Sequence, residues 1–228
     1  MKKLSVAAIV DFQRRSEKSK KTFVNDLRLD VEKKENEEGD GGRHYWITSL
    51  SAVSNAYKSN DLQLIKQKID QLEEKFENSD NKRSKIMYQR NIDILYGFED
   101  VDFKKWQPSR QPKFLVKSKL KSLIEIKGFQ IQALPHHVYS YEKNDKEEVG
   151  AVWFVAKVNG FTRLELALFS DILFRYLEIN FSDKYIVNPK YCIAVDAVQN
   201  VAINYSQIQR GDINTLLIPT LDELRAMM

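Results

Sequence analysis

The clearest pattern of apolar and polar positions in this chain is an amphipathic stripe between Asp61 and Asn78. Its apolar side chains recur at alternating spacings of three and four residues, at Leu62, Ile65, Ile69, Leu72 and Phe76. Such spacings place these side chains on one face of an α-helix and the charged residues on the opposite face. The pattern therefore predicts a surface helix that packs on another part of the protein.

Other segments of the N-terminal half also have helical patterns. Ser5 is suited to cap a first helix, because its hydroxyl can accept a backbone N–H of the first turn. Further helices are expected from near Tyr45 and over residues 85–96. The two prolines of QPSRQPKF, next to Trp106, then interrupt helical structure. We expect the architecture to change from helical to mixed at this point.

From residue 118 onward the chain alternates between β-rich runs and polar turns. The runs SKLKSLIEIKGFQIQAL, HHVYSYEK and EVGAVWFVAKV predict consecutive strands, with a hairpin turn at NDKEE. The next segment, FTRLELALFSDILFRYLEI, has a helical pattern but is apolar on nearly every side, so it should lie between other layers. YCIAVDAV and VAINYSQI then predict two more strands, and TLDELRAM a short C-terminal helix.

This order of elements indicates the fold class. Strands in sequence, a buried helix and further strands predict an α+β (α/β) fold with a mixed central β-sheet flanked by helices. A chain of 228 residues is long enough for one substantial core. We therefore expect a single domain, in which residues 1–112 form a helical N-terminal region and residues 113–228 form the α/β core.

Composition narrows the class of protein further. The chain has 43% hydrophobic and 30% charged residues, which is ordinary for a globular protein. No apolar run approaches the ~20 residues that cross a bilayer, and Asp11 interrupts the apolar patch that a signal peptide would need. We expect a cytoplasmic protein without a membrane partner. Cys192 is the single cysteine, which excludes an internal disulfide, a thiolate zinc site and a cysteine-ligated iron–sulfur cluster within the chain.

A net charge of +4 permits nucleic-acid binding without requiring it. The segment DFKKWQPSRQPKFLVKSKLK interleaves aromatic and basic residues, so Phe103, Trp106 and Phe114 could stack on bases. The basic residues that would contact phosphates are Lys104, Lys105, Arg110, Lys113 and Lys117. The alternative is a linker whose aromatic rings dock on the core and whose lysines are only solvated.

Four segments, taken in order, resemble the PD-(D/E)XK nuclease superfamily, specifically the RecB-like branch that includes CRISPR adaptation exonucleases. LSVAAIVDFQRR resembles the opening helix of that branch, and GGRHYW its Gly-x-x-His helix start. LPHHVYSYEKNDKEEVGAVWFVAKVNG resembles its G-x-x-D strand, hairpin and E-x-K strand, and ELALF its Q-x-x-x-Y helix. The resemblance spans most of the chain and implies a restriction-endonuclease-like core.

The chain departs from the family pattern where the family binds metal. Family members hold Mg²⁺ or Mn²⁺ with carboxylates from adjacent strands, beside a lysine. Lys157 is retained here, but Val155 stands at the position of the metal-binding Glu, and His136 or His137 at that of the Asp. Valine has no donor atom, and neutral imidazole is a poor ligand for a hard ion. The resemblance therefore implies a disabled site with no cofactor; Mg²⁺ or Mn²⁺ is expected only if the chain is an active nuclease.

Three further positions belong to the resemblance. Glu165 replaces the motif Gln and Phe169 the motif Tyr, one turn apart on one helix face that the resemblance directs toward the E-x-K strand. We expect Glu165 to form an ion pair with Lys157, because a buried charge needs a partner. His44 matches a metal-binding His of the family or is a plain helix-start residue. His137 is a second candidate metal ligand, unless the histidine pair points to opposite faces of a strand.

The leading hypothesis is a catalytically inactive relative of RecB-like nucleases. It would act as a nucleic-acid-binding or assembly subunit of a protein complex, in antiviral defence or DNA processing by analogy with that branch. DNA and RNA are both candidate ligands. One alternative is an active metal-dependent DNA nuclease whose ligands have moved to Glu165, Asp171 or Asp145. The other is a structural interaction protein whose Leu62–Phe76 stripe docks on a partner helix.

Overall fold

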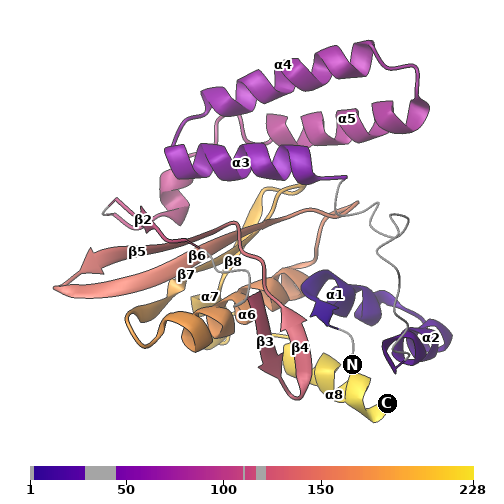
Figure 1. Cartoon of the computed structure of the whole chain (residues 1–228), viewed down its shortest axis with the longest axis vertical. Coiled ribbons are helices and arrows are strands. Elements are labelled where there is room, and N and C mark those ends of the chain that lie inside the picture. The colour runs from indigo at the N-terminus through magenta and orange to yellow at the C-terminus, as the bar shows by residue number, and fades with distance from the viewer. Residues whose placement is uncertain (1–2, 29–44, 110, 117–121) are drawn as a thin grey trace.

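The computed structural model describes residues 3–28, 45–109, 111–116 and 122–228. Within these residues the chain folds around a five-stranded mixed sheet that has helices on both faces (Figure 1). The predicted α+β class, with a mixed central sheet flanked by helices, is confirmed. None of the helices in the described ranges is long and apolar enough to cross a membrane.

The central sheet has the strand order β2-β5-β6-β7-β8. Its neighbours are antiparallel except β6 and β7, which are parallel and are connected by helix α6 (Arg163–Phe181). A parallel pair requires such a crossover, because the chain must return to the end where the first strand began. The strands are β2 (Lys113–Phe114), β5 (His137–Lys143), β6 (Lys146–Val155), β7 (Ile186–Asp196) and β8 (Val201–Asn204).

Strand β6 is buried on both faces, which explains its nearly continuous apolar sequence. Successive side chains of a strand point to opposite faces. Ala151, Trp153 and Val155 therefore enter the core on the α6 side, whereas Val152 and Phe154 enter the core beneath α3. The strand separates two hydrophobic cores and fixes the positions of both helical layers.

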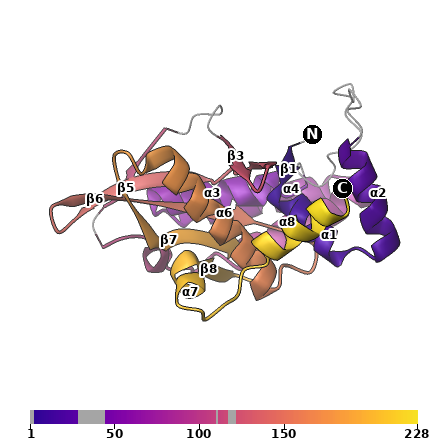
Figure 2. The same ribbon diagram turned by 90° about the horizontal axis from the view of Figure 1, so that it is seen from below.

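Helix α6 lies in the layer below the sheet, as its all-round apolar sequence predicts. Side chains from Glu165 to Leu173 are buried without interruption. Figure 2 shows α6 and α8 (Leu217–Ala226) on the side of the sheet opposite to α3. Helix α1 (Val6–Arg14) packs against the same layer and begins at Ser5, whose hydroxyl accepts the Ala8 N–H at 3.1 Å as predicted. Helix α2 (Glu17–Arg28) follows it.

The other face of the sheet is covered by α3 (Ile47–Ser59), α4 (Gln63–Glu77), α5 (Lys82–Tyr96) and the short helix η1 (Phe103–Trp106). The predicted amphipathic helix is α4, and the centre of its stripe is buried at Ile65, Ile69 and Leu72. These side chains belong to the core that α3 and α5 share. The centre of the apolar stripe, which the structural alternative assigns to a partner helix, is therefore covered by α3 and α5 of the same chain.

Two sequence predictions about strands were wrong in detail. The run around Gly128 is a hairpin rather than one strand, and it forms a second sheet of order β1-β4-β3. Lys127 and Gly128 both have positive φ, 52° and 74°, which a two-residue turn requires and a continuous strand does not allow. The strands are β1 (Leu4–Ser5), β3 (Leu123–Ile126) and β4 (Phe129–Gln132).

The second error concerns VAINYSQI, of which β8 takes the first half. The second half forms helix α7 (Tyr205–Gln209). The Gln207 side chain accepts the Asn204 N–H at 3.0 Å, which is the return contact of a helix capping box. This local hydrogen bond starts a helix where β-propensity alone predicts a strand.

Candidate functional site

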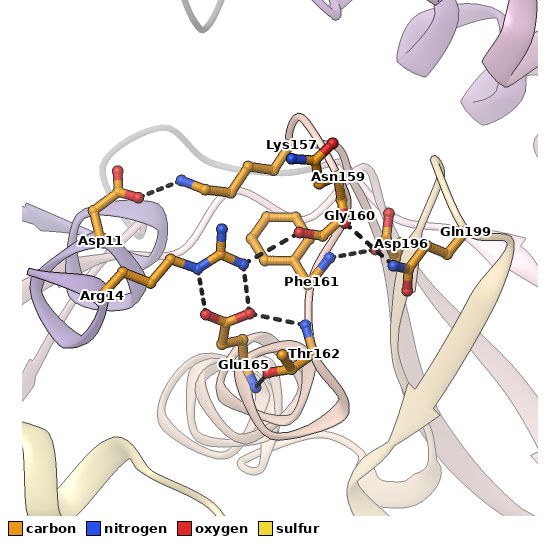
Figure 3. A network of polar contacts seen from close by, with 10 residues as sticks. All are labelled: Asp11, Arg14, Lys157, Asn159, Gly160, Phe161, Thr162, Glu165, Asp196 and Gln199. Atoms are coloured by element: carbon orange, nitrogen blue, oxygen red, sulfur yellow. Dashed lines mark hydrogen bonds and ion pairs between the residues drawn. The ribbon is translucent and has the colours of Figure 1, made fainter.

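The candidate site lies at the carboxyl end of strand β6. Val155 ends β6 and is the direct neighbour of Asp196, which ends the parallel strand β7. The loop from Ala156 to Thr162 then leads into α6, and α1 lies against the start of that helix. Figure 3 shows side chains from α1, this loop, α6 and β7 meeting in one polar network. Residues distant in sequence converge here because parallel strands end at the same edge of the sheet.

A cavity of about 480 Å³ opens beside this network. The described residues that line it include no Asp, Glu, Lys or Arg. Ile47 and Leu134 line it with 51% and 45% of their surfaces exposed, so its mouth is apolar as well. The main apolar side chains of the lining are Trp46, Leu50, Trp153, Phe154, Val155, Phe161 and Phe169.

Val155 is part of the cavity wall. It is only 7% exposed and lies in the same core cluster as Trp153, Phe161 and Phe169. The Phe169 ring is edge-on to Trp153 and to Phe161, with centroids 5.4 and 5.2 Å apart. The face of α6 that carries Phe169 is therefore directed at β6, which is the orientation that the family resemblance implies. An apolar wall stands at the position that the family resemblance assigns to a metal-binding carboxylate.

The ion pair predicted between Lys157 and Glu165 was wrong. Lys157 is paired with Asp11 of α1, and Glu165 is paired with Arg14 of the same helix (Figure 3). Arg14 donates to both Glu165 carboxylate oxygens, from Nε at 2.5 Å and from Nη2 at 2.6 Å, and Nη2 also donates to the Gly160 carbonyl at 3.2 Å. The planar guanidinium fits both oxygens at once, which one ammonium group cannot do.

Glu165 also belongs to the capping box that begins α6. The Thr162 N–H donates to its carboxylate at 2.8 Å, and the Thr162 hydroxyl accepts the Glu165 N–H at 3.3 Å. Burial opposes ionisation of Glu165, but the hydrogen bonds from Arg14 and Thr162 outweigh it and lower the pKa of the carboxyl group. The acid inside an apolar helix is thus explained by a helix cap and an arginine.

Asp196 is a fully buried acid that the sequence analysis missed. Its carboxylate accepts the Phe161 N–H at 2.6 Å and the Val198 N–H at 2.9 Å, which ties the loop after β6 to the turn after β7. Gly160 makes this approach possible: its φ is 70°, and a Cβ there would lie 2.6 Å from Asp196 Oδ2. Burial raises the pKa of Asp196, and the backbone hydrogen bonds offset only part of that effect.

Asp196 is expected to make part of the stability pH-dependent. Because its folded pKa lies above the ordinary value of 3.8, its contribution to the free energy of unfolding is largest below about pH 4 and falls as the pH rises through the folded pKa. Urea unfolding of Asp196→Asn from about pH 4 to about pH 7 should lack this decline. The control is Asp183→Asn, at an exposed acid. Parallel curves for wild type and Asp196→Asn would contradict the assignment.

The two histidines of the predicted site point to different places. His137 Nε2 lies 2.7 Å from the Ser54 hydroxyl, and its ring stacks on Tyr57 of α3 at 6.0 Å. His136 lines the cavity with Val155, and its Nδ1 accepts the Phe154 N–H at 3.3 Å. Alternation along the strand separates the pair, so His136 rather than His137 shares the site with Val155. His44, the other candidate metal ligand, lies outside the described residues.

The carboxylates near Lys157 are already engaged by cations or backbone groups. In the described part of the chain, no group of three or more His, Cys, Asp and Glu side chains is arranged to hold a metal ion. Asp171 is buried and holds Arg175 at 2.7 Å and the Thr215 hydroxyl at 2.8 Å, and Asp145 lies in the β5–β6 turn with a φ of 59°. Neither of these two proposed relocated ligands joins the network at Lys157.

Trp106, which the sequence analysis expects to stack on bases, lies in the core rather than on an open surface. Its side chain is 6% exposed and contacts the rings of Phe98, Phe103 and Phe154 in the core beneath α3. The alternative, in which these aromatic rings dock on the core, is correct for Phe103 and Trp106. Lys104, Lys105 and Lys113 are exposed and Phe114 is half-buried, while Arg110 and Lys117 lie outside the described residues.

Comparison with known proteins assigns no family to the chain. No family model, no curated protein and no solved structure matches it.

Proposed function

We propose that this chain is a catalytically inactive relative of RecB-like nucleases that acts as a nucleic-acid-binding or assembly subunit of a protein complex. The observation that carries the proposal is the apolar cavity at the end of β6, where the resemblance expects a metal site. The strand order supports it as well, since an antiparallel hairpin, a crossover helix and a parallel strand follow one another as the aligned motifs require.

The chemistry of the retained lysine also supports a non-catalytic role. Activation of water by such a site requires a cation held by carboxylates next to the lysine. Val155 provides no ligand, and Lys157 is paired with Asp11. Glu165, the nearest buried acid on α6, is neutralised by Arg14. The charged groups at this strand end fasten α1 to the loop and to α6, which is a structural task.

The cavity is suited to an apolar side chain of a partner protein. Its volume lies within the range of small-molecule and anchor-residue pockets, and its lining provides dispersion contacts rather than charge. The exposed Ile47 and Leu134 extend the apolar surface around it. Burial of such an anchor in a central pocket is how a few residues supply most of the affinity of a protein interface.

Binding of an apolar probe tests this cavity directly. Anilinonaphthalene sulfonate is expected to bind the folded protein saturably, and Ile47→Ser together with Leu134→Ser should weaken binding at least about fivefold, since each substitution removes roughly 1 kcal/mol or more of apolar contact. The matched control is Ile179→Ser, at a 59% exposed residue of α6 outside the cavity. Equal affinity of all three proteins in fluorescence titrations would contradict the proposed binding surface.

One observation favours an active nuclease as the second candidate. Asp11 places a carboxylate beside Lys157, and its side chain is 43% exposed. This acid belongs to α1 and was not among the relocated ligands considered from the sequence. In such an enzyme Asp11 would provide a metal ligand and Lys157 would act on the attacking water, so activity would disappear in both Asp11→Asn and Lys157→Ala.

A further inference from the structure

A second pocket, of about 540 Å³, lies at the other end of α3 from the apolar cavity, and the two share no lining residue. Six of its nine lining residues have polar side chains, and four of these are amides. Lys58 is its single charged side chain among the described residues, and Phe114 its aromatic one. The amides belong to Asn55, Asn60, Gln107 and Gln111.

Phe114 is held in a fixed orientation by other rings. It is half-buried on strand β2 and makes edge contacts with His137, Tyr139 and Tyr57, at centroid distances of 5.2, 6.0 and 6.4 Å. The ammonium group of Lys58 lies over the ring at 5.7 Å. Phe114 and Lys58 both line the pocket, and a planar base that displaces the ammonium group from the ring can stack in its place.

The charge around the pocket is suited to a phosphate chain. Lys104 and Lys105 precede Gln107, and Lys113 precedes Phe114; all three are exposed. Together with Lys58, they form no ion pair within the described residues. The acids nearest to these lysines in sequence, Asp61 and Asp102, form hydrogen bonds with backbone groups. Asp61 accepts the Gln63 N–H at 2.9 Å, and Asp102 accepts the Lys104 N–H at 3.0 Å.

We infer that this pocket binds one nucleotide of a single-stranded nucleic acid, with the base stacked on Phe114 and the adjoining phosphates near Lys58 and Lys113. The inference rests on the nucleic-acid-binding part of the proposed function. Stacking on one ring requires a base face that a duplex conceals, so the ligand is single-stranded. Amide side chains can donate to and accept from base edges, which makes them suitable neighbours for a stacked base.

Fluorescence anisotropy with a labelled single-stranded oligonucleotide of mixed sequence tests the inference. Phe114→Leu keeps most of the packing volume but removes the π face, and it should weaken binding about 5- to 150-fold. Lys58→Gln should reduce the slope of log affinity against log salt by about 0.7, because one phosphate contact is lost. Circular dichroism of each variant checks that the fold is retained.

A second lysine–phenylalanine pair provides the matched control. Lys85 lies over the Phe76 ring at 5.2 Å on the α4–α5 hairpin. Phe76→Leu and Lys85→Gln should leave affinity within about twofold of wild type, since neither residue lines the pocket. If they weaken binding as much as the pocket variants do, the effect is non-specific and the assigned site is wrong.

The remaining outcomes separate the inference from the function on which it rests. If the protein binds the single strand tightly and Phe114→Leu does not change the affinity, the pocket is not the binding site, but nucleic-acid binding itself is supported. If no nucleic acid binds at low salt, both the pocket and the nucleic-acid-binding function are refuted. The probe titration of the apolar cavity is independent of these outcomes. Equal affinity for duplex and single strand refutes the stacked base. If a free mononucleotide displaces the labelled oligonucleotide completely at a similar concentration, the ligand is a soluble nucleotide, and the inferred single-stranded nucleic acid is refuted.

Discussion

Replacing Trp106 with alanine is expected to lower the free energy of unfolding by about 3–5 kcal/mol. The indole is 6% exposed and packs among Phe98, Phe103 and Phe154, so its removal leaves a cavity that these rings cannot fill. The Trp106 carbonyl accepts the Tyr57 hydroxyl at 3.2 Å, and this contact survives in the variant. The loss is therefore one of packing, and equilibrium urea unfolding measures it.

The control for Trp106 is its neighbour Lys105. The Lys105 ammonium lies 4.5 Å from the indole centroid but is exposed, so Lys105→Ala should change the free energy of unfolding by less than about 1 kcal/mol. A small effect of Trp106→Ala on stability, combined with a large loss of nucleic-acid affinity, would instead favour the base-stacking role that the sequence suggests.

Replacing Arg14 with methionine is expected to cost about 2–4 kcal/mol. The substitution leaves Glu165, whose side chain is 8% exposed, without the cation that holds both its oxygens. The lower part of the range applies if water reaches the carboxylate, because the Arg14 side chain is itself 38% exposed. Urea unfolding at neutral pH measures the change.

Two further measurements distinguish the ion pair from a general effect on α1. Arg14→Met combined with Glu165→Met should recover much of the loss, since no charge is then left unpaired. The pairing lowers the pKa of Glu165. The free energy of unfolding of wild type should therefore exceed that of Arg14→Met above about pH 4.5, and this difference should shrink as the pH falls through the folded pKa of Glu165. A difference that is constant with pH would contradict the pairing.

Much of the fold could be predicted because local pattern and burial agree. The nearly continuous apolar sequence of β6 and the all-round apolar sequence of α6 both follow from a strand and a helix that lie between two layers. The centre of the α4 stripe is likewise buried where its spacing requires. The hairpin at Lys127 and Gly128 was missed because the β-rich residues on both sides hide a two-residue turn.

The candidate site could be predicted only in part. The family resemblance implied that Val155 and Lys157 on the strand lie near Glu165 on the helix, but nothing in the sequence indicated the partners that α1 provides. Arg14 and Glu165 are 151 positions apart, and no periodicity in the chain connects them. The segment around Trp106 has the composition of a binding surface, yet long-range packing buries two of its rings, which composition cannot reveal.

The central claim is that the site at the end of β6 has no nuclease activity, and a cleavage assay tests it most directly. Purified wild type is incubated with single- and double-stranded DNA and RNA in the presence of Mg²⁺ or Mn²⁺. We expect no metal-dependent cleavage above that of Lys157→Ala prepared in the same way. Robust cleavage by wild type that disappears in both Asp11→Asn and Lys157→Ala would contradict this account and establish an active nuclease with relocated ligands.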